Sequence, residues 1–293
     1  MRGSADGDVC GDDKVMWLMY DMVSTDGQHT LVGKGEVAYE EVKRIKALFE
    51  FTSSYSVVKM MEDVVIRNHR DYINHMHPEN LRQYHTEMEE AVIAANKYAL
   101  NYATSIQSFI DVTERQLRIT KGEGKELELY RAFQSQMYDS HVEYRFWMRL
   151  RNFIVHCGFP YTEVNHNARE MEIRCAKSHL LSSGKWNTVK QDILKMSEYV
   201  KIEEMTGKMT GCISALRLAF VGMYAEDIAQ ASVEYATFCR QHDVREPVFV
   251  EVESEEDIGI EGFSFNPLPV SDLVLALDDL KKVPFVKLNL VKM

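Results

Sequence analysis

The sequence lacks any apolar run long enough to cross a membrane. A membrane-spanning helix needs about 20 consecutive apolar residues, and the most apolar stretch, residues 213–225, is interrupted by Arg217. We therefore expect no membrane contact. The segment 1–13 is polar and Gly-rich and has no apolar core of the kind found in a secretory signal. We interpret it as a disordered leader or a cloning remnant.

Cysteine is scarce, and the five that are present are widely spaced with no Cys-x-x-Cys pair. An odd number of scattered cysteines is typical of reduced thiols rather than of a disulfide framework, so we expect a cytoplasmic protein. Histidines gather in residues 69–85, but no cysteine joins them and Pro78 indicates a loop or a helix boundary there. We therefore expect no metal site and no cofactor.

Positive charge is in the minority, because 34 Lys and Arg face 45 Asp and Glu and leave a net charge of -11. The molecule as a whole repels polyanions, so any contact with a nucleic acid must come from a local basic patch.

Helix breakers are few, with only 6 Pro and 15 Gly in 293 residues. Apolar spacing of three to four residues predicts helices from Glu36 onward, and we place two long ones at 78–119 and 125–157, forming an antiparallel hairpin. Alternating patterns predict a hairpin around Asp26-Gly27 and a strand or hairpin insertion at 161–180. Further helices are expected at 187–200 and 209–241, before an extended acidic tail. The predicted fold is mainly α, a helical bundle over 14–241 with small β additions, followed by a C-terminal α/β appendage over 242–293.

The segment HVEYRFWMRLRNFIVH, residues 141–156, carries the densest polar pattern of the chain. With about 100° per residue, five basic or amide side chains fall in one sector of the helix. They are His141, Arg145, Arg149, Asn152 and His156. The neighbouring sector is apolar and is the predicted core face, with Val142, Phe146, Leu150, Phe153, Ile154 and Cys157. Guanidinium forks and imidazoles complement oxyanions, so we assign RNA phosphate contacts to His141, Arg145 and Arg149 and expect Glu143 to be exposed to solvent.

A histidine that titrates near neutrality can take a proton from a ribose 2′-hydroxyl, and a nearby arginine can stabilise the charge that develops on phosphorus. These two groups suffice for RNA cleavage without a metal. Residues 151–156 read Arg-Asn-Phe-Ile-Val-His. This segment resembles the motif of the HEPN ribonucleases, which is an Arg, usually a polar residue after it, and a His about four to six residues beyond the Arg.

The resemblance implies a helical bundle that forms a homodimer with a composite active site and cleaves RNA without a metal. Carried over by position, Arg151 and His156 are catalytic and Asn152 orients or binds phosphate. The family also implies the setting of a toxin or an antiviral (anti-phage) defence effector, with an inhibitor or sensor protein as a possible partner.

The catalytic hypothesis has one geometric difficulty. Five residues apart on a straight helix, Arg151 and His156 point about 140° from each other, so either the helix end distorts near Gly158 or a second subunit completes the pair.

The alternative function is a non-catalytic dimeric scaffold that binds a partner protein or a nucleotide. In that case His156 caps a helix C-terminus, and Arg145 and Arg149 belong to a solvated face.

Overall fold

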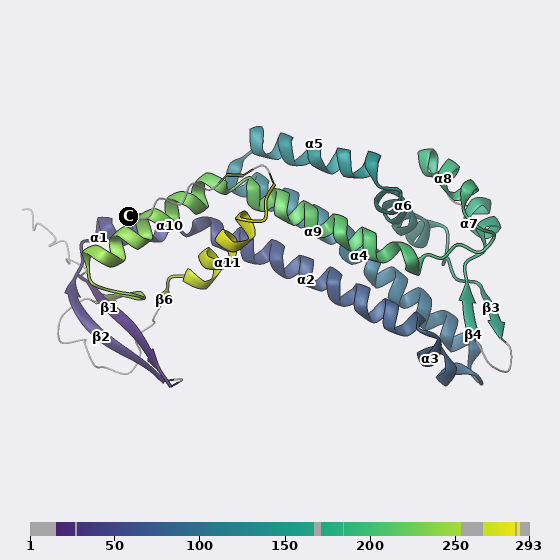
Figure 1. The fold of residues 1–293 in the computed structure, drawn as a ribbon, viewed down its shortest axis with the longest axis horizontal. Helices are drawn as coiled ribbons and strands as arrows, with labels where there is room; N and C mark the ends of the chain where they lie inside the picture. Colours follow the sequence, from purple (N-terminus) through teal and green to yellow (C-terminus); the bar gives the residue numbers. More distant parts are fainter. Residues whose placement is uncertain are drawn as a thin grey trace, which may run out of the picture. The chain divides into compact units, whose positions relative to one another are not determined.

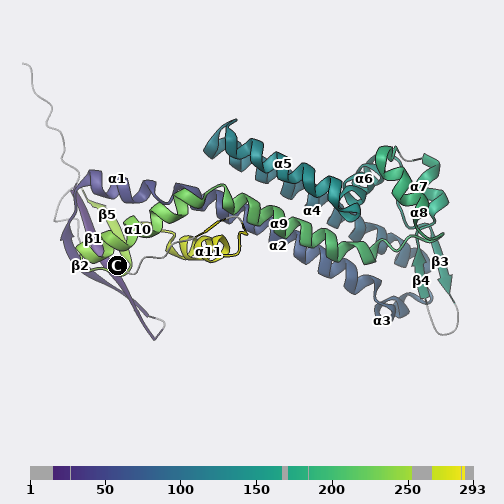
Figure 2. The ribbon, with the colours of Figure 1, turned by 45° about the horizontal axis from the view of Figure 1, so that its top comes forward.

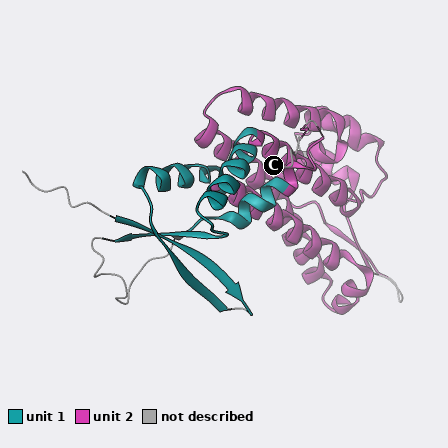
Figure 3. Ribbon diagram, turned by 60° about the vertical axis from the view of Figure 1, so that its left-hand side comes forward, with its two compact units in different colours: residues 1–52, 226–277 teal, residues 53–225, 278–293 magenta. Residues whose placement is uncertain are grey.

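The computed structural model describes residues 16–26, 28–166, 171–183, 185–252, 266–284 and 286–287. The predicted leader 1–13 and parts of the acidic tail lie outside these residues. The chain divides into two compact units, residues 1–52 with 226–277 (unit 1) and residues 53–225 with 278–293 (unit 2) (Figure 3). The boundary predicted at residues 241–242 therefore falls inside unit 1.

Unit 1 contains a four-stranded sheet with the order β2-β1-β5-β6. Its strands are β1 (Met16–Thr25), β2 (Gln28–Glu36), β5 (Pro247–Val252) and β6 (Asn266–Pro267) (Figure 1). The predicted hairpin is present, and Asp26 at its turn has a φ of 51°. Strand β1 also pairs antiparallel with β5, with Leu18 opposite Val250. The N-terminal hairpin and the C-terminal tail, predicted as separate additions, are thus one sheet.

Helices α1 (Tyr39–Ala47) and α10 (Ala225–Gln241) complete the regular structure of unit 1, with parts of α2 and α11. A break at Leu48–Phe49 separates α1 from α2 (Glu50–Met76), which runs through the polar residues 52–54 without interruption. Thr52 is buried, and its hydroxyl donates a hydrogen bond to the carbonyl of Phe49 at 2.6 Å. The hydroxyl thus satisfies a backbone carbonyl that precedes the first residue of α2.

Unit 2 is a bundle of long helices with small additions. Its long helices are the rest of α2, α4 (Met88–Lys121), α5 (Lys125–Ser140), α6 (Val142–His156) and α9 (Thr206–Gly222). The shorter elements are α3 (Pro78–Leu81), η1 (Arg82–Tyr84), β3 (Glu163–His166), β4 (Met171–Arg174), α7 (Lys177–Ser183), η2 (Asn187–Val189), α8 (Lys190–Lys195), η3 (Glu203–Met205) and the end of α11 (Val270–Leu280). Helix α4 packs against α5, α6 and α9 (Figure 2). The mainly α class with small β additions is confirmed. No helix in the described part of the chain is both long and apolar enough to cross a bilayer.

The core of unit 2 is aromatic. The fully buried ring of Trp147 meets the ring of Tyr102 edge-on at 4.7 Å between centroids and the ring of Tyr72 at 6.1 Å. Large buried rings supply much of the apolar area that a core of this size needs. This cluster fixes α6 against α2 and α4, and thereby fixes the side of α6 that faces away from the core.

Both long helices predicted in this unit are shorter in the structure. Pro78 begins the four-residue α3, and the long helix α4 starts only at Met88. Helix α4 ends at Lys121, two residues beyond the predicted end, and Gly122 follows with a φ of 71°. The helix predicted over 125–157 is interrupted at His141, whose backbone is extended.

The break at His141 has a visible cause in the side chain of Arg145. Its guanidinium donates hydrogen bonds to the carbonyls of Tyr138 and Asp139, at 3.4 and 3.1 Å, in the last turn of α5. Carbonyls at a helix end have no partner within the helix, so Arg145 stabilises the end of α5.

Glu143, expected to be exposed, is buried with its carboxylate 2.8 Å from the Lys208 ammonium.

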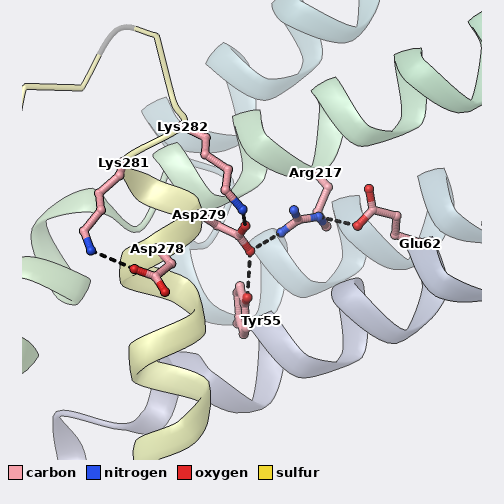
Figure 4. Close-up of polar contacts among 7 residues, drawn as sticks. All are labelled: Tyr55, Glu62, Arg217, Asp278, Asp279, Lys281 and Lys282. Atoms are coloured by element: carbon pink, nitrogen blue, oxygen red, sulfur yellow. Dashed lines mark hydrogen bonds and ion pairs between the residues drawn. The ribbon is translucent and has the colours of Figure 1, made fainter.

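A buried ionic cluster joins three helices of unit 2 (Figure 4). The Arg217 guanidinium on α9 pairs with Glu62 on α2 and with Asp279 on α11, the latter at 2.6 Å. Tyr55 and Lys282 also donate hydrogen bonds to Asp279, at 2.7 and 2.9 Å. The side chains of Arg217, Glu62 and Asp279 are 8 to 11% exposed. Arg217, which interrupts the most apolar stretch of the sequence, is therefore matched by two carboxylates.

Candidate functional site

Helix α6 carries the predicted site, and its core face is largely as expected. Phe146, Leu150, Phe153 and Ile154 are buried. Cys157, predicted on this face, is exposed because it lies one residue beyond the end of α6. Burial of this face leaves the polar sector of the helix accessible along its C-terminal half.

A pocket of about 540 Å³ opens on that polar sector, and we call it the α6–η2 pocket. Three predicted site residues, Arg149, Asn152 and His156, line it from α6. Its other described lining residues are Phe153, Cys157, Lys185, Trp186 and Asn187. Arg149 and His156 are two helical turns apart, so they share a face, and Asn152 lies between them along the helix axis. The structure thus brings an arginine, an amide and an imidazole together, as the polar stripe predicts.

The charge of the α6–η2 pocket is of one sign. None of its described lining residues is acidic. Arg149, His156 and Lys185 make no hydrogen bond or ion pair with another described residue. Arg149 and Lys185 are cationic, and the imidazole of His156 adds a hydrogen-bonding group, so the pocket is suited to bind an anion.

The far wall of the pocket is held in place by Trp186. Its buried ring stacks on Phe146 and Phe153, with centroids 5.8 and 5.5 Å apart, and its Nε1 donates to the Leu180 carbonyl at 2.6 Å. This packing fixes the neighbours Lys185 and Asn187 beside α6. Lys185 has no part in the predicted polar stripe, because it lies 29 or more positions from it in sequence, and only the packing of Trp186 brings it to the site.

Arg151 does not line the α6–η2 pocket. Its Nη1 donates to the Oδ1 of Asn152 at 3.2 Å, and its buried Nε has no hydrogen-bond partner among the described atoms. Helix α6 stays regular through His156, since the amide of Cys157 still bonds to the carbonyl of Phe153 at 2.8 Å. Distortion begins only at Gly158, whose φ is 144°. The separation of about 140° between Arg151 and His156 is therefore retained, and Arg149 is the arginine that shares a pocket with His156.

Arg145 and His141 lie away from this pocket. The Arg145 guanidinium binds Asp192 with two hydrogen bonds of 2.7 and 3.1 Å. These bonds raise the pKa of Arg145 and lower the pKa of Asp192. His141 is half-buried at the junction of α5 and α6. The donors of Arg145 are thus occupied within the protein.

A second cavity of about 410 Å³ adjoins the first, and we call it the α4–α6 groove. Arg149 and Asn152 line both cavities. The groove is formed by side chains from α4, α5 and α6, and unlike the first pocket it contains the carboxylates of Asp111 and Glu114. The sequence offered no signal for this groove, because its residues come from three successive helices and only the packing of these helices brings them together.

Metal-ligating side chains do not gather in the described part of the chain, where no group of three or more His, Cys, Asp or Glu is placed to hold an ion. The histidines of residues 69–85 do not form one cluster in the structure. His75 is buried, whereas His85 Nδ1 lies 2.6 Å from Nε2 of His166 on β3.

Comparison with protein-family models, with curated proteins and with solved structures finds no match to this chain.

Proposed function

We propose that this chain is a metal-independent endoribonuclease of the HEPN type that cleaves RNA at the α6–η2 pocket. The observation that carries the proposal is the grouping of Arg149, His156 and Lys185 around one cavity. These side chains are without partners among the described residues, and no described acidic residue lines the cavity with them. A phosphodiester supplies the negative charge and the acceptor oxygens that such a cavity lacks.

The chemistry follows from the order of these groups along α6. His156 accepts the proton of the ribose 2′-hydroxyl, and the 2′-oxygen attacks phosphorus. The bond to the 5′-oxygen breaks, and a proton passes to that oxygen as it leaves. The products are a 2′,3′-cyclic phosphate and a 5′-hydroxyl. Arg149 and the amide of Asn152 stabilise the added negative charge on phosphorus, and Lys185 holds a neighbouring phosphate.

A homodimer remains part of the proposal. One α6–η2 pocket contains a single imidazole among its described residues, and a second acid or base is needed to protonate the leaving 5′-oxygen. A second copy of the chain supplies another His156, and supplies Arg151 from the opposite face of α6. The pair of residues that the motif places together is then completed between subunits.

The test incubates purified protein with mixed cellular RNA in EDTA and maps the new ends chemically. Wild-type protein is expected to produce 2′,3′-cyclic phosphate ends. His156→Ala is expected to lose a factor of about 10² to 10⁴, the usual contribution of a general acid or base. The matched control is His77→Ala, which removes an exposed imidazole outside both cavities and should cleave like wild type.

Two arginine variants locate the active arginine. Arg149→Ala is expected to lower the rate about 10²- to 10³-fold, as removal of one charge-stabilising donor does. Arg151→Ala should have a similar effect only if the site is composite, and in that case the rate should depend on dimer concentration. RNA left intact by correctly folded wild type, combined with binding of a partner protein through this face, would replace the proposal with the non-catalytic scaffold.

A further inference from the structure

The α4–α6 groove has the lining of a base-binding site rather than of a phosphate site. Its apolar side chains include Ile110, Tyr144 and Met148, and Gln107 and Asp111 add polar groups from α4. Ile110 and Tyr144 are buried, whereas Asp111 is exposed. A flat ring with hydrogen-bonding edges fits apolar side chains that are bordered by polar ones.

Charge separates the two cavities. The α6–η2 pocket has no acidic side chain among its described lining residues, whereas the groove has two carboxylates. A phosphate is attracted to the first and repelled by the second. Because Arg149 and Asn152 line both cavities, a phosphate held at these residues has its attached nucleoside at the mouth of the groove.

Asp111 is the carboxylate of the groove that can still accept hydrogen bonds from a base. Glu114 accepts two hydrogen bonds from Arg131, at 3.2 and 3.3 Å. Asp111 accepts one from the Gln107 amide at 2.8 Å, and no described Lys, Arg or His pairs with it. A carboxylate has acceptor capacity for several donors. Asp111 therefore retains room for further N–H donors at the edge of the groove.

Guanine is the base that matches this acceptor. Its Watson–Crick edge presents N1–H and the N2 amino group side by side, so both can donate to one carboxylate. Adenine and cytosine offer a single amino group on that edge, and uracil offers a single N–H. Tyr138 is half-buried in the groove, edge-on to Tyr144 with centroids 6.3 Å apart, and leaves ring surface on which a base can stack.

We propose that the α4–α6 groove binds a guanine next to the scissile phosphate through Asp111 and makes cleavage guanine-specific. This inference rests on the proposed ribonuclease function for its phosphate position. The guanine contact itself is a binding property of the groove and is measurable without catalysis.

The experiment uses oligonucleotides in which a single ribose has a free 2′-hydroxyl and all others carry 2′-O-methyl groups, so that one phosphodiester can be cut. The base on either side of that phosphodiester is varied among G, inosine, A, C and U. Guanine should be preferred on one side, and inosine, which lacks the N2 amino group, should be cut about 10- to 100-fold more slowly, as expected for loss of a hydrogen bond to a charged acceptor.

Asp111→Asn keeps the size of the side chain and removes its charge. This variant should lose the preference for guanine over inosine, measured as the ratio of the two cleavage rates. Asp71→Asn is the matched control, because Asp71 is an exposed aspartate on α2 that lines neither cavity, and it should keep the preference. Tyr138→Leu should slow cleavage beside every base, because stacking does not discriminate between bases, and Tyr138→Phe should restore it.

The outcomes separate the two proposals. Cleavage with equal rates beside all bases, or an unchanged guanine preference in Asp111→Asn, overturns the inference and leaves the ribonuclease standing. If wild type cuts no RNA, the ribonuclease proposal fails. Equilibrium binding of GMP and AMP then tests whether the groove binds guanine. Tighter binding of GMP that is lost in Asp111→Asn supports it, and equal binding of both nucleotides overturns it.

Discussion

Replacing Arg217 by Met should destabilise unit 2 strongly, because Arg217 is the shared partner of two buried carboxylates (Figure 4). Removing one member of a buried ion pair costs about 3 to 5 kcal/mol, since the other member stays buried without its counter-charge. Asp279 keeps its hydrogen bonds from Tyr55 and Lys282. Glu62 is then the only one of the two carboxylates that is left without a partner among the described residues. Because Asp279 stays partnered, we expect the lower end of the range, about 3 kcal/mol.

The assay is thermal and urea unfolding at neutral pH, followed by circular dichroism. For a unit of this size, about 3 kcal/mol corresponds to a fall in Tm of roughly 6 to 12 °C. The double variant Arg217→Met with Glu62→Met removes the orphaned charge as well, so it should be more stable than Arg217→Met alone. Arg115→Met is the control, since Arg115 is exposed on α4 and has no described partner. It should change stability by less than about 0.5 kcal/mol.

Acid should weaken the same cluster in a defined range. Burial alone raises the pKa of Asp279, but the hydrogen bonds from Arg217, Lys282 and Tyr55 outweigh it and lower the pKa from 3.8 to about 2. A pKa that is lowered by folding stabilises the folded state above the unfolded value, and this stabilisation is lost as the pH falls through the folded value. The difference in unfolding free energy between wild type and Arg217→Met should therefore shrink from pH 4 to pH 2. A loss below about 1 kcal/mol in Arg217→Met, or a difference that does not change with acid, would refute this account of the cluster.

Two further predictions concern the predicted RNA contacts. Arg145→Met should lower stability by about 1 to 2 kcal/mol in urea unfolding, because it removes hydrogen bonds to a charged partner, Asp192. The same variant should leave RNA affinity unchanged. A drop in affinity without a drop in stability would show that Arg145 contacts RNA after all. Lys185→Ala should weaken RNA binding and reduce the slope of log K against log salt by about 0.7, the value for one phosphate contact with a single strand. An unchanged slope in fluorescence titrations would remove Lys185 from the RNA contacts.

The helical class and the core face of α6 were predictable from sequence because both depend on local periodicity. Phe146, Leu150 and Phe153 recur at helical spacing and are buried as expected. The break at His141 was not predictable in this way. It depends on Arg145, whose guanidinium binds the carbonyls that end α5, and nothing in the local pattern separates such an arginine from one that faces solvent.

The candidate site was predictable only in part for a similar reason. Arg149, Asn152 and His156 are close in sequence, and helical geometry places them on one face. Lys185 and Asp111 reach the same region through tertiary packing, from a loop and from α4. The four-stranded sheet likewise joins segments from opposite ends of the chain. Periodicity predicts that each segment is a strand, but it does not predict which strand pairs with which.

The sheet of unit 1 has a consequence for the order of events during synthesis. Strand β1 needs β5 as a neighbour, and Leu18 must wait for Val250 to emerge from the ribosome. At cellular translation rates this delay is on the order of 10 to 50 s. Meanwhile β1 and β2 form at most an isolated hairpin, which is marginally stable in water, and its open edge is a template for pairing with other chains. The intervening residues 53–225 of unit 2 are by then fully synthesised. Nascent chains therefore pass through a period in which the helices of residues 53–225 are synthesised while the sheet is incomplete, and during this period the edge of the hairpin is open to other chains.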